Sequence, residues 1–192
     1  MEKLTLDRAK ELLALTTTEG HLFDHARAVS ACMGAMAVRF GADADTQAYW
    51  RAVGWLHDYD FERFPEEHLR HTERELLDAG VDAVTVRAIL SHGYGLCTEV
   101  EPQTDLEKSL YTVDELSGLI AATAKMHPAG IAGLQAASVK KKFKDKRFAA
   151  KIDRAVIQDG CDRLGMELTE VIGICIAGML PEAEALGIGP RA

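Results

Sequence analysis

Several features that mark other protein classes are missing from this chain. The beginning, MEKLTLDRAK, has no hydrophobic core of a signal peptide. The longest apolar stretch, residues 171–180, contains two glycines and is too short to cross a bilayer. No two of the four cysteines form a CxxC pair, so we expect reduced, scattered thiols, namely Cys32, Cys97, Cys161 and Cys175. Together these absences predict a cytoplasmic protein without a membrane partner.

Familiar phosphate-binding and nucleophile motifs are absent as well. The sequence has no P-loop, no GxGxxG after a strand and no GxSxG elbow, which argues against the enzyme classes that depend on them. The small residues 130–133 are better explained as a turn or a packing site. Strand-like alternation is nearly absent, and helical periodicity dominates the chain.

Charge and length narrow the possibilities further. The formal net charge is −8, and this excess of acid makes a nucleic-acid partner unlikely. The 192 residues suffice for one domain with a substantial core, and no linker or repeat divides them. We therefore expect a single all-α domain over residues 1–192.

Start and stop signals place the expected helices along the chain. Gly41 is a good stop, Pro65 suits a first helical turn, and Asp82 is a plausible N-cap. Residues 104–107 form a capping-box pattern, and Pro128 ends the helix that follows. The predicted helices cover about residues 6–15, 21–40, 45–58, from 65 to before Gly80, 82–92, 104–127, 153–164 and 169–186, with a loop at 94–103.

The pair His57-Asp58 follows an apolar helical run and offers two metal-ligand types at one place. Imidazole suits zinc, iron, copper or nickel, and a carboxylate suits magnesium or manganese. Taken alone the pair is also compatible with a histidine at an ordinary helix C-terminus. Its context favours a site, because His25 lies early on an amphipathic helix and Asp114 has apolar neighbours on both sides. An aspartate on such a face must be paired or bound to a cation; a salt bridge or simple exposure is the alternative.

In this order on helices, these residues resemble the HD superfamily of metal-dependent phosphohydrolases. The matching segments are His25–Val29, Gly54–Asp58, Ile89–Gly93 and Val113–Leu116. The resemblance implies an HD-domain helical bundle with its core at about 20–125, a helical extension at about 126–192, and a metal site between helices. Its ligands would be His25, His57, Asp58 and Asp114, with Asp58 also catalytic. The ion would be manganese, iron, cobalt, nickel, magnesium or zinc. Residues 58–68 and 138–149 also resemble a small branch of predicted HD hydrolases, which implies no particular substrate.

Two-metal members of that superfamily carry further histidines before the last aspartate. Here His68 and His92 match best, so one or two metal ions are expected, with Asp58 as the bridge. The chain departs from the double histidine of related proteins, because Gly93 follows His92. His71 is expected on a polar surface, whereas His21 either lines the pocket or is exposed.

The resemblance implies hydrolysis of a small phosphorylated metabolite or nucleotide. A bound cation lowers the pKa of its water to about 7, so that hydroxide forms at neutral pH, and neutralises phosphoryl charge. Within the basic segment, Lys141, Lys142 and Lys144 are possible contacts for substrate phosphate, although such charge runs are usually solvated. Two alternatives stay open: a di-iron oxygenase of the HD type, and a non-catalytic nucleotide-binding module.

Overall fold

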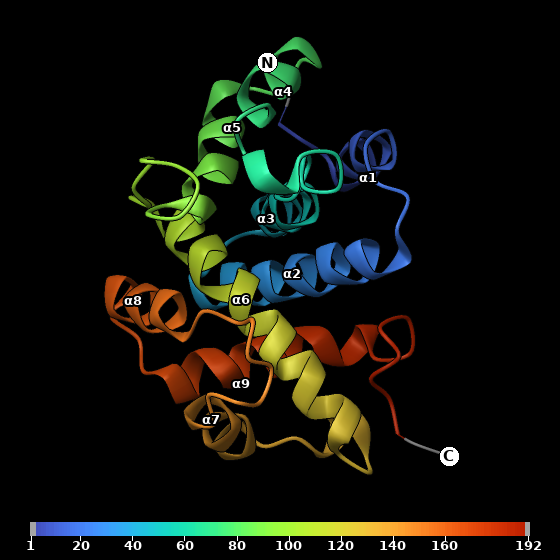
Figure 1. Cartoon of the computed structure of the whole chain (residues 1–192), viewed down its shortest axis with the longest axis vertical. Coiled ribbons are helices and arrows are strands. Elements are labelled where there is room, and N and C mark those ends of the chain that lie inside the picture. The colour runs from blue at the N-terminus through green and yellow to red at the C-terminus, as the bar shows by residue number, and fades with distance from the viewer. Residues whose placement is uncertain (1–2, 191–192) are drawn as a thin grey trace.

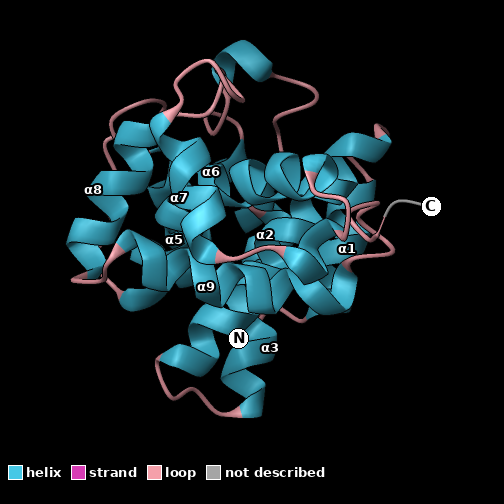
Figure 2. Ribbon diagram, turned by 90° about the horizontal axis from the view of Figure 1, so that it is seen from below, coloured by secondary structure: helices cyan, strands magenta, loops and turns pink. Residues whose placement is uncertain are grey.

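The computed structural model describes residues 3–190, and helices with their connecting loops account for this part of the chain (Figure 2). The single β-type contact in the described range is an isolated bridge between Tyr94 and Thr98. The predicted all-α fold class is therefore confirmed. The α-helices are α1 (Leu6–Ala14), α2 (Gly20–Arg39), α3 (Ala44–Leu56), α4 (Thr72–Asp78), α5 (Ala83–Leu90), α6 (Asp105–Met126), α7 (Ala136–Lys144), α8 (Arg154–Leu164) and α9 (Leu168–Met179). Short 3-10 turns are η1 (Pro65–Glu67), η2 (Ser91–Gly93), η3 (Gly130–Gly133) and η4 (Leu180–Glu182).

Helix α2 crosses the middle of the molecule and contacts α3, α6 and α9 (Figure 1). Its central side chains are small or flexible, and Val29, Cys32, Met33 and Met36 are fully buried. A helix that is apolar on most of its surface is stable only when neighbours cover it on several sides. This central position brings the beginning of α2, which carries His25, close to α3 and α6.

A close approach between α2 and α3 depends on Gly54. A Cβ atom at this position would lie 2.8 Å from Cγ of Met33 and 3.1 Å from Cα of Ser30. Any larger residue would push the two helices apart, because packed cores have few voids. Since Gly54 lies one turn before His57, the same contact positions the end of α3 beside α2.

Helix α6 begins and ends as its local sequence predicts. The Thr104 hydroxyl accepts the Glu107 N–H, and the Glu107 carboxylate accepts the N–H of Thr104, which completes the predicted capping box. The helix ends at Met126, and His127, which precedes proline, is extended. Asp82 caps α5 as predicted, accepting N–H groups from Val84 and Thr85.

Two predicted helices have different bounds in the structure. The helix expected from Pro65 is only the 3-10 turn η1, and residues 68–71 separate it from α4. In this gap Leu69 adopts a φ of 69°, a left-handed conformation that interrupts a helix. The last helix was predicted to reach residue 186, but α9 ends at Met179 and η4 follows.

The C-terminal helices pack against the centre of the molecule. Helix α8 lies on α6, α9 lies on α2, and α7 contacts α6 and α9. Among residues 3–190, no single helix is long and apolar enough to cross a membrane. Only α8 taken together with α9 and η4 meets that criterion of length and hydropathy, and this pair is bent by 99°.

Candidate metal centre

Three helices bring four of the predicted ligands to one point. His25 comes from α2, His57 caps the C-terminus of α3, Asp58 follows it in the next turn, and Asp114 projects from α6. The Nε2 atoms of His25 and His57 are 3.1 Å apart. Oδ1 of Asp114 lies 2.9 Å from the first of them and 3.3 Å from the second. Oδ2 of Asp58 lies 3.5 Å and 3.4 Å from the same two atoms.

A second group of ligand atoms meets the other oxygen of Asp58. Oδ1 of this carboxylate lies 3.3 Å from Nε2 of His68 and 3.6 Å from Nε2 of His92. The two Nε2 atoms are themselves 3.1 Å apart. His68 lies just after η1 and His92 within η2, so neither stands on the pair of consecutive helices that the sequence suggested. The ligand atoms of these two groups are close enough to hold a metal ion each.

Each of three histidines is oriented by a hydrogen bond from its other ring nitrogen. Nδ1 of His57 donates to the carbonyl oxygen of Gly54 at 2.9 Å, and Nδ1 of His92 donates to that of Ile89 at 2.6 Å. Nδ1 of His68 lies 2.9 Å from Oδ1 of Asp60. Because a carbonyl oxygen only accepts, Nδ1 carries the proton of each donated hydrogen bond. These contacts therefore leave Nε2 of His57 and of His92 to face the cluster. Such outer contacts fix the tautomer that a metal-binding imidazole needs.

Asp60 organises the segment that carries His68. The side chain is fully buried and lies two residues after Asp58. Besides the imidazole of His68, it accepts the backbone N–H of Leu69 at 3.0 Å and that of His71 at 3.2 Å. These bonds hold the left-handed Leu69, a conformation that costs about 1–2 kcal/mol for such a residue. Sequence reasoning did not single out Asp60 as a site residue, although its place beside the His-Asp pair was a usable signal.

The titration behaviour of the cluster reflects opposite charges at short range. Burial lowers the pKa of His57, but Asp58 and Asp114 outweigh burial and hold this pKa well above its ordinary value. At His68, burial likewise lowers the pKa, but the carboxylates of Asp58 and Asp60 raise it further, to about 9. For Asp58 and Asp114, burial raises the pKa, but the neighbouring histidines lower it further than burial raises it. The carboxylates thus favour positive charge here, which protons on the imidazoles or a divalent cation in their place can supply.

The cluster forms the floor of a cavity of about 520 Å³. Glu115 also lines it, and its carboxylate accepts the backbone N–H of Asp153 at 3.1 Å. Burial, followed by the charge of Asp114, raises the pKa of Glu115 to about 7. Apolar wall residues come from segments far apart in sequence, and for this reason sequence reasoning did not find them: Leu22, Phe61, Leu96, Ile152 and Val156.

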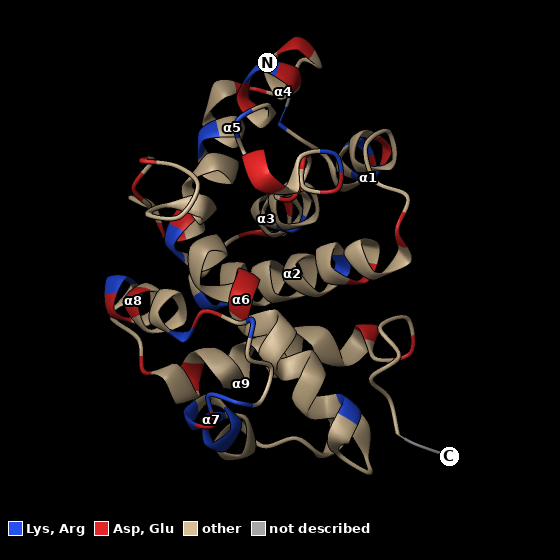
Figure 3. Ribbon diagram, viewed as in Figure 1, with Lys and Arg blue, Asp and Glu red and all other residues tan. Residues whose placement is uncertain are grey.

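The remaining predicted site residues lie in different places. His21 lines the cavity, and its side chain is also 72% exposed, so it combines the two positions that the sequence left open. His71 stacks on Phe64 and is 38% exposed. Lys141, Lys142 and Lys144 belong to α7, where the basic residues gather (Figure 3). These three lysines are not among the residues that line the metal cavity.

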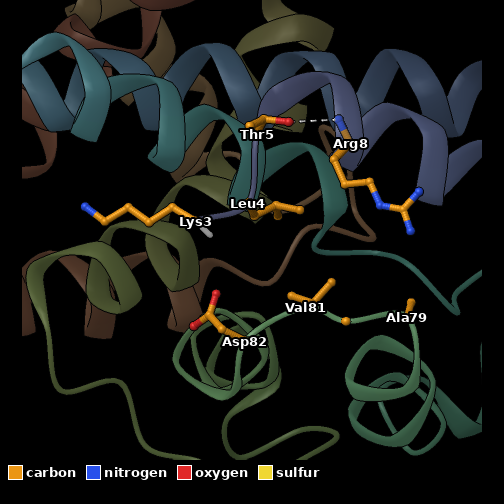
Figure 4. Close-up of a pocket in the computed structure, with 8 residues that line it drawn as sticks. Lys3, Leu4, Thr5, Arg8, Ala79, Val81 and Asp82 are labelled. Atoms are coloured by element: carbon orange, nitrogen blue, oxygen red, sulfur yellow. Dashed lines mark hydrogen bonds between the residues drawn. The ribbon is translucent and has the colours of Figure 1, made fainter. Parts of the chain in front are cut away.

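A different cavity, of about 490 Å³, separates the N-terminal segment from the turn between α4 and α5 (Figure 4). Its polar groups are engaged locally: the Thr5 hydroxyl accepts the N–H of Arg8, and Asp82 caps α5. All groups of potential metal ligands found in residues 3–190 belong to the cluster around Asp58. The chemistry therefore concentrates in the cavity above that cluster.

Comparison with known proteins adds no relative to this description. No protein-family model matches the chain, no curated protein matches it, and no solved structure matches it.

Proposed function

We propose that this protein is a metal-dependent phosphohydrolase of the HD type with a two-metal centre. The observation that carries the proposal is the division of Asp58 between two ligand groups. One of its oxygens faces His25 and His57, and the other faces His68 and His92. A carboxylate with this arrangement would be a ligand of two cations at once, which is the arrangement that two-metal hydrolytic sites use.

The spacing of the ligand atoms fits small divalent cations. A cation about 2.1 Å from its ligands holds neighbouring ligand atoms about 3.0 Å apart in an octahedron and about 3.4 Å apart in a tetrahedron. Around His25 and His57 the distances between ligand atoms run from 2.9 to 3.5 Å. The mixture of imidazole and carboxylate suits manganese, iron, cobalt, nickel or zinc, and to a lesser degree magnesium. His25, His57, Asp58 and Asp114 would hold one ion, and His68, His92 and Asp58 the other.

The chain's own residues would orient and shield the reaction. When bound, the cations supply a hydroxide nucleophile at neutral pH and neutralise charge on the phosphoryl oxygens. Asp58 keeps the two halves of the centre in register, while the carbonyl groups of Gly54 and Ile89 hold the imidazoles of His57 and His92. The apolar wall of the cavity would limit the access of water to the ester, which strengthens electrostatic interactions inside it. The substrate would be a small phosphorylated metabolite or nucleotide in the cytoplasm.

One observation favours a second candidate, a di-iron oxygenase. No lysine or arginine of residues 3–190 lines the cavity, so a substrate without phosphate would also fit it. Oxygen consumption by the iron-loaded protein with an unphosphorylated alcohol, in the absence of phosphatase activity, would favour this candidate. Phosphate release with added manganese and no oxygen uptake would exclude it.

The experiment is Asp58→Ala, measured by metal analysis and by phosphate release from a panel of phosphate monoesters and nucleotides. Loss of the bridging carboxylate should lower the bound metal from two ions to one or none. It should also reduce turnover by at least about 100-fold, the scale of one electrostatic catalytic group. Asp78→Ala is the matched control, because the side chain of Asp78 is 75% exposed on α4. Full activity and full metal content in the Asp58 variant would refute the assignment, whereas metal binding without any phosphate release by the wild-type protein would leave a non-catalytic binding module.

A further inference from the structure

The wall above the metal ligands is apolar on several sides. Leu22 extends from α2, Phe61 from the turn after α3, Leu96 from the loop before α6, and Ile152 and Val156 from the beginning of the α8 region. Phe61 stands edge-on to the ring of His68, with ring centroids 5.2 Å apart. A substrate whose reacting group lies on the metal ions must therefore place its remaining part against hydrocarbon.

Positive side chains are absent from this wall. Within residues 3–190, the lining of the cavity contains no lysine or arginine. On α7, Lys140 donates to the Thr169 hydroxyl, and Lys142 lies over the ring of Phe148. Lys125 lines a smaller hollow of about 160 Å³ that shares His21 and His25 with the metal cavity. However, Lys125 lies eleven residues after Asp114, about 16 Å along α6, and does not line the metal cavity itself.

The formal charge of the centre then limits the charge of its ligand. Two divalent cations bring four positive charges, and Asp58 and Asp114 bring two negative ones, while the imidazoles are neutral when they bind metal. The centre therefore has about two net positive charges, or about one when it also holds the hydroxide. A phosphate monoester carries about −1.5 to −2 near pH 7, so one such group already matches or exceeds the charge of the centre. Asp60 and Glu115 lie nearby and add only negative charge.

From this balance we propose that the cavity selects phosphate monoesters whose alcohol part is uncharged and largely apolar. The inference rests on the proposed phosphohydrolase function and narrows its substrate class. A second or third phosphate, as in a nucleoside triphosphate, would lie against the apolar wall without a counter-charge, and burying such a charge is unfavourable. Phe61, Leu96 and Ile152 are the residues that set this specificity, because they line the same cavity as the ligands.

Binding of phosphonates tests the inference without any turnover. The protein is loaded with manganese and titrated calorimetrically with n-hexylphosphonate, methylphosphonate and a methylenediphosphonate carrying the same hexyl chain, while retention of manganese is monitored. n-Hexylphosphonate should bind at least about tenfold more tightly than methylphosphonate, since burial of each CH₂ contributes about 0.8 kcal/mol. It should also bind at least about tenfold more tightly than the diphosphonate, because no lysine or arginine lines the described cavity to balance the charge of the second group.

Leu96→Lys would add a positively charged side chain to the cavity, where residues 3–190 provide no lysine or arginine. Leu96 is 64% exposed at the cavity, so a lysine is tolerated there. This lysine should reduce the difference in affinity between n-hexylphosphonate and the diphosphonate. Leu15→Lys, at a leucine that is 76% exposed outside this cavity, should leave the preference unchanged. Equal or tighter binding of the diphosphonate by the wild-type protein overturns the substrate class and leaves the phosphohydrolase proposal standing. If manganese binds and no phosphonate does, the phosphohydrolase proposal itself fails.

Discussion

Replacement of Asp60 by asparagine should weaken one metal site and spare the other. The carboxylate accepts three hydrogen bonds, from Nδ1 of His68 at 2.9 Å, from the Leu69 N–H at 3.0 Å and from the His71 N–H at 3.2 Å. Asparagine can keep the first two, but its amide group would face the His71 N–H, and the negative charge beside His68 is lost. A hydrogen bond to a buried charged group contributes about 1.5–3 kcal/mol.

This energy corresponds to a loss of about 10- to 100-fold in affinity for the second ion, the usual scale for residues that orient a metal ligand. Manganese binding measured by calorimetry should show the first ion unchanged on His25, His57 and Asp114 and the second weakened. The free energy of unfolding of the metal-free variant, measured in urea, separates this effect from general destabilisation. Released from its bonds, Leu69 should also leave its left-handed conformation more readily.

Glu62→Gln is the matched control for this prediction. Glu62 lies two residues after Asp60 and likewise accepts three hydrogen bonds, two from Thr18 and one from the Glu19 N–H, but it is only partly buried and lies outside the ligand cluster. The Glu62→Gln variant should bind both ions as the wild-type protein does. The reasoning is refuted if Asp60→Asn binds both ions with wild-type affinity, or if it loses both ions equally while its metal-free form remains folded.

Two further predictions concern stability. Burial raises the pKa of Glu107, but the N–H groups at the start of α6 and the Arg87 guanidinium lower it further, so its folded-state pKa lies below the ordinary 4.5. A depressed pKa contributes stability above pH 4.5 that is lost as the pH falls through the folded-state value. Glu107→Gln should therefore lower the free energy of unfolding by about 1–3 kcal/mol at pH 7. In urea unfolding, the difference between variant and wild type should shrink below pH 4.5, and a constant difference would contradict the ionic explanation. At Gly160, an added Cβ would lie 2.2 Å from the Thr112 hydroxyl oxygen, so Gly160→Ala should force α8 away from α6 and lower the melting temperature, with a cost of about 1–3 kcal/mol. Gly173→Ala in α9, where nothing lies within 4 Å, is the control and should stabilise the helix by up to about 1 kcal/mol; equal effects at both positions would show that packing at Gly160 is not tight.

Local signals in the sequence determined most helix boundaries, because capping and proline effects act within one turn of the chain. The capping box at Thr104 and Glu107 and the N-cap at Asp82 could be predicted without knowledge of the fold, and the structure contains both. The segment after Pro65 behaved differently. The conformation of this segment depends on buried contacts of Asp60 with residues eight to eleven positions away, which no local sequence pattern indicates.

The ligand types at the candidate metal centre were also determined by the sequence. A histidine early on one amphipathic helix, a His-Asp pair at the end of another and an aspartate on an apolar helical face predict metal chemistry wherever the helices lie. Only the tertiary structure decided that Oδ1 and Oδ2 of Asp58 face different histidine pairs, because that division depends on how α2, α3, α6 and η2 cross.

The same holds for the wall of the cavity. Leu22, Phe61, Leu96 and Ile152 look like ordinary apolar residues in sequence, since periodicity shows only that a side chain faces some neighbour. The lysines of α7 stand out in sequence, yet they do not line the cavity, because α7 packs against α6 and α9 through its apolar side. Residue chemistry could thus be read along the chain, whereas the surroundings of each group depend on contacts between distant segments that only the packed helices bring together.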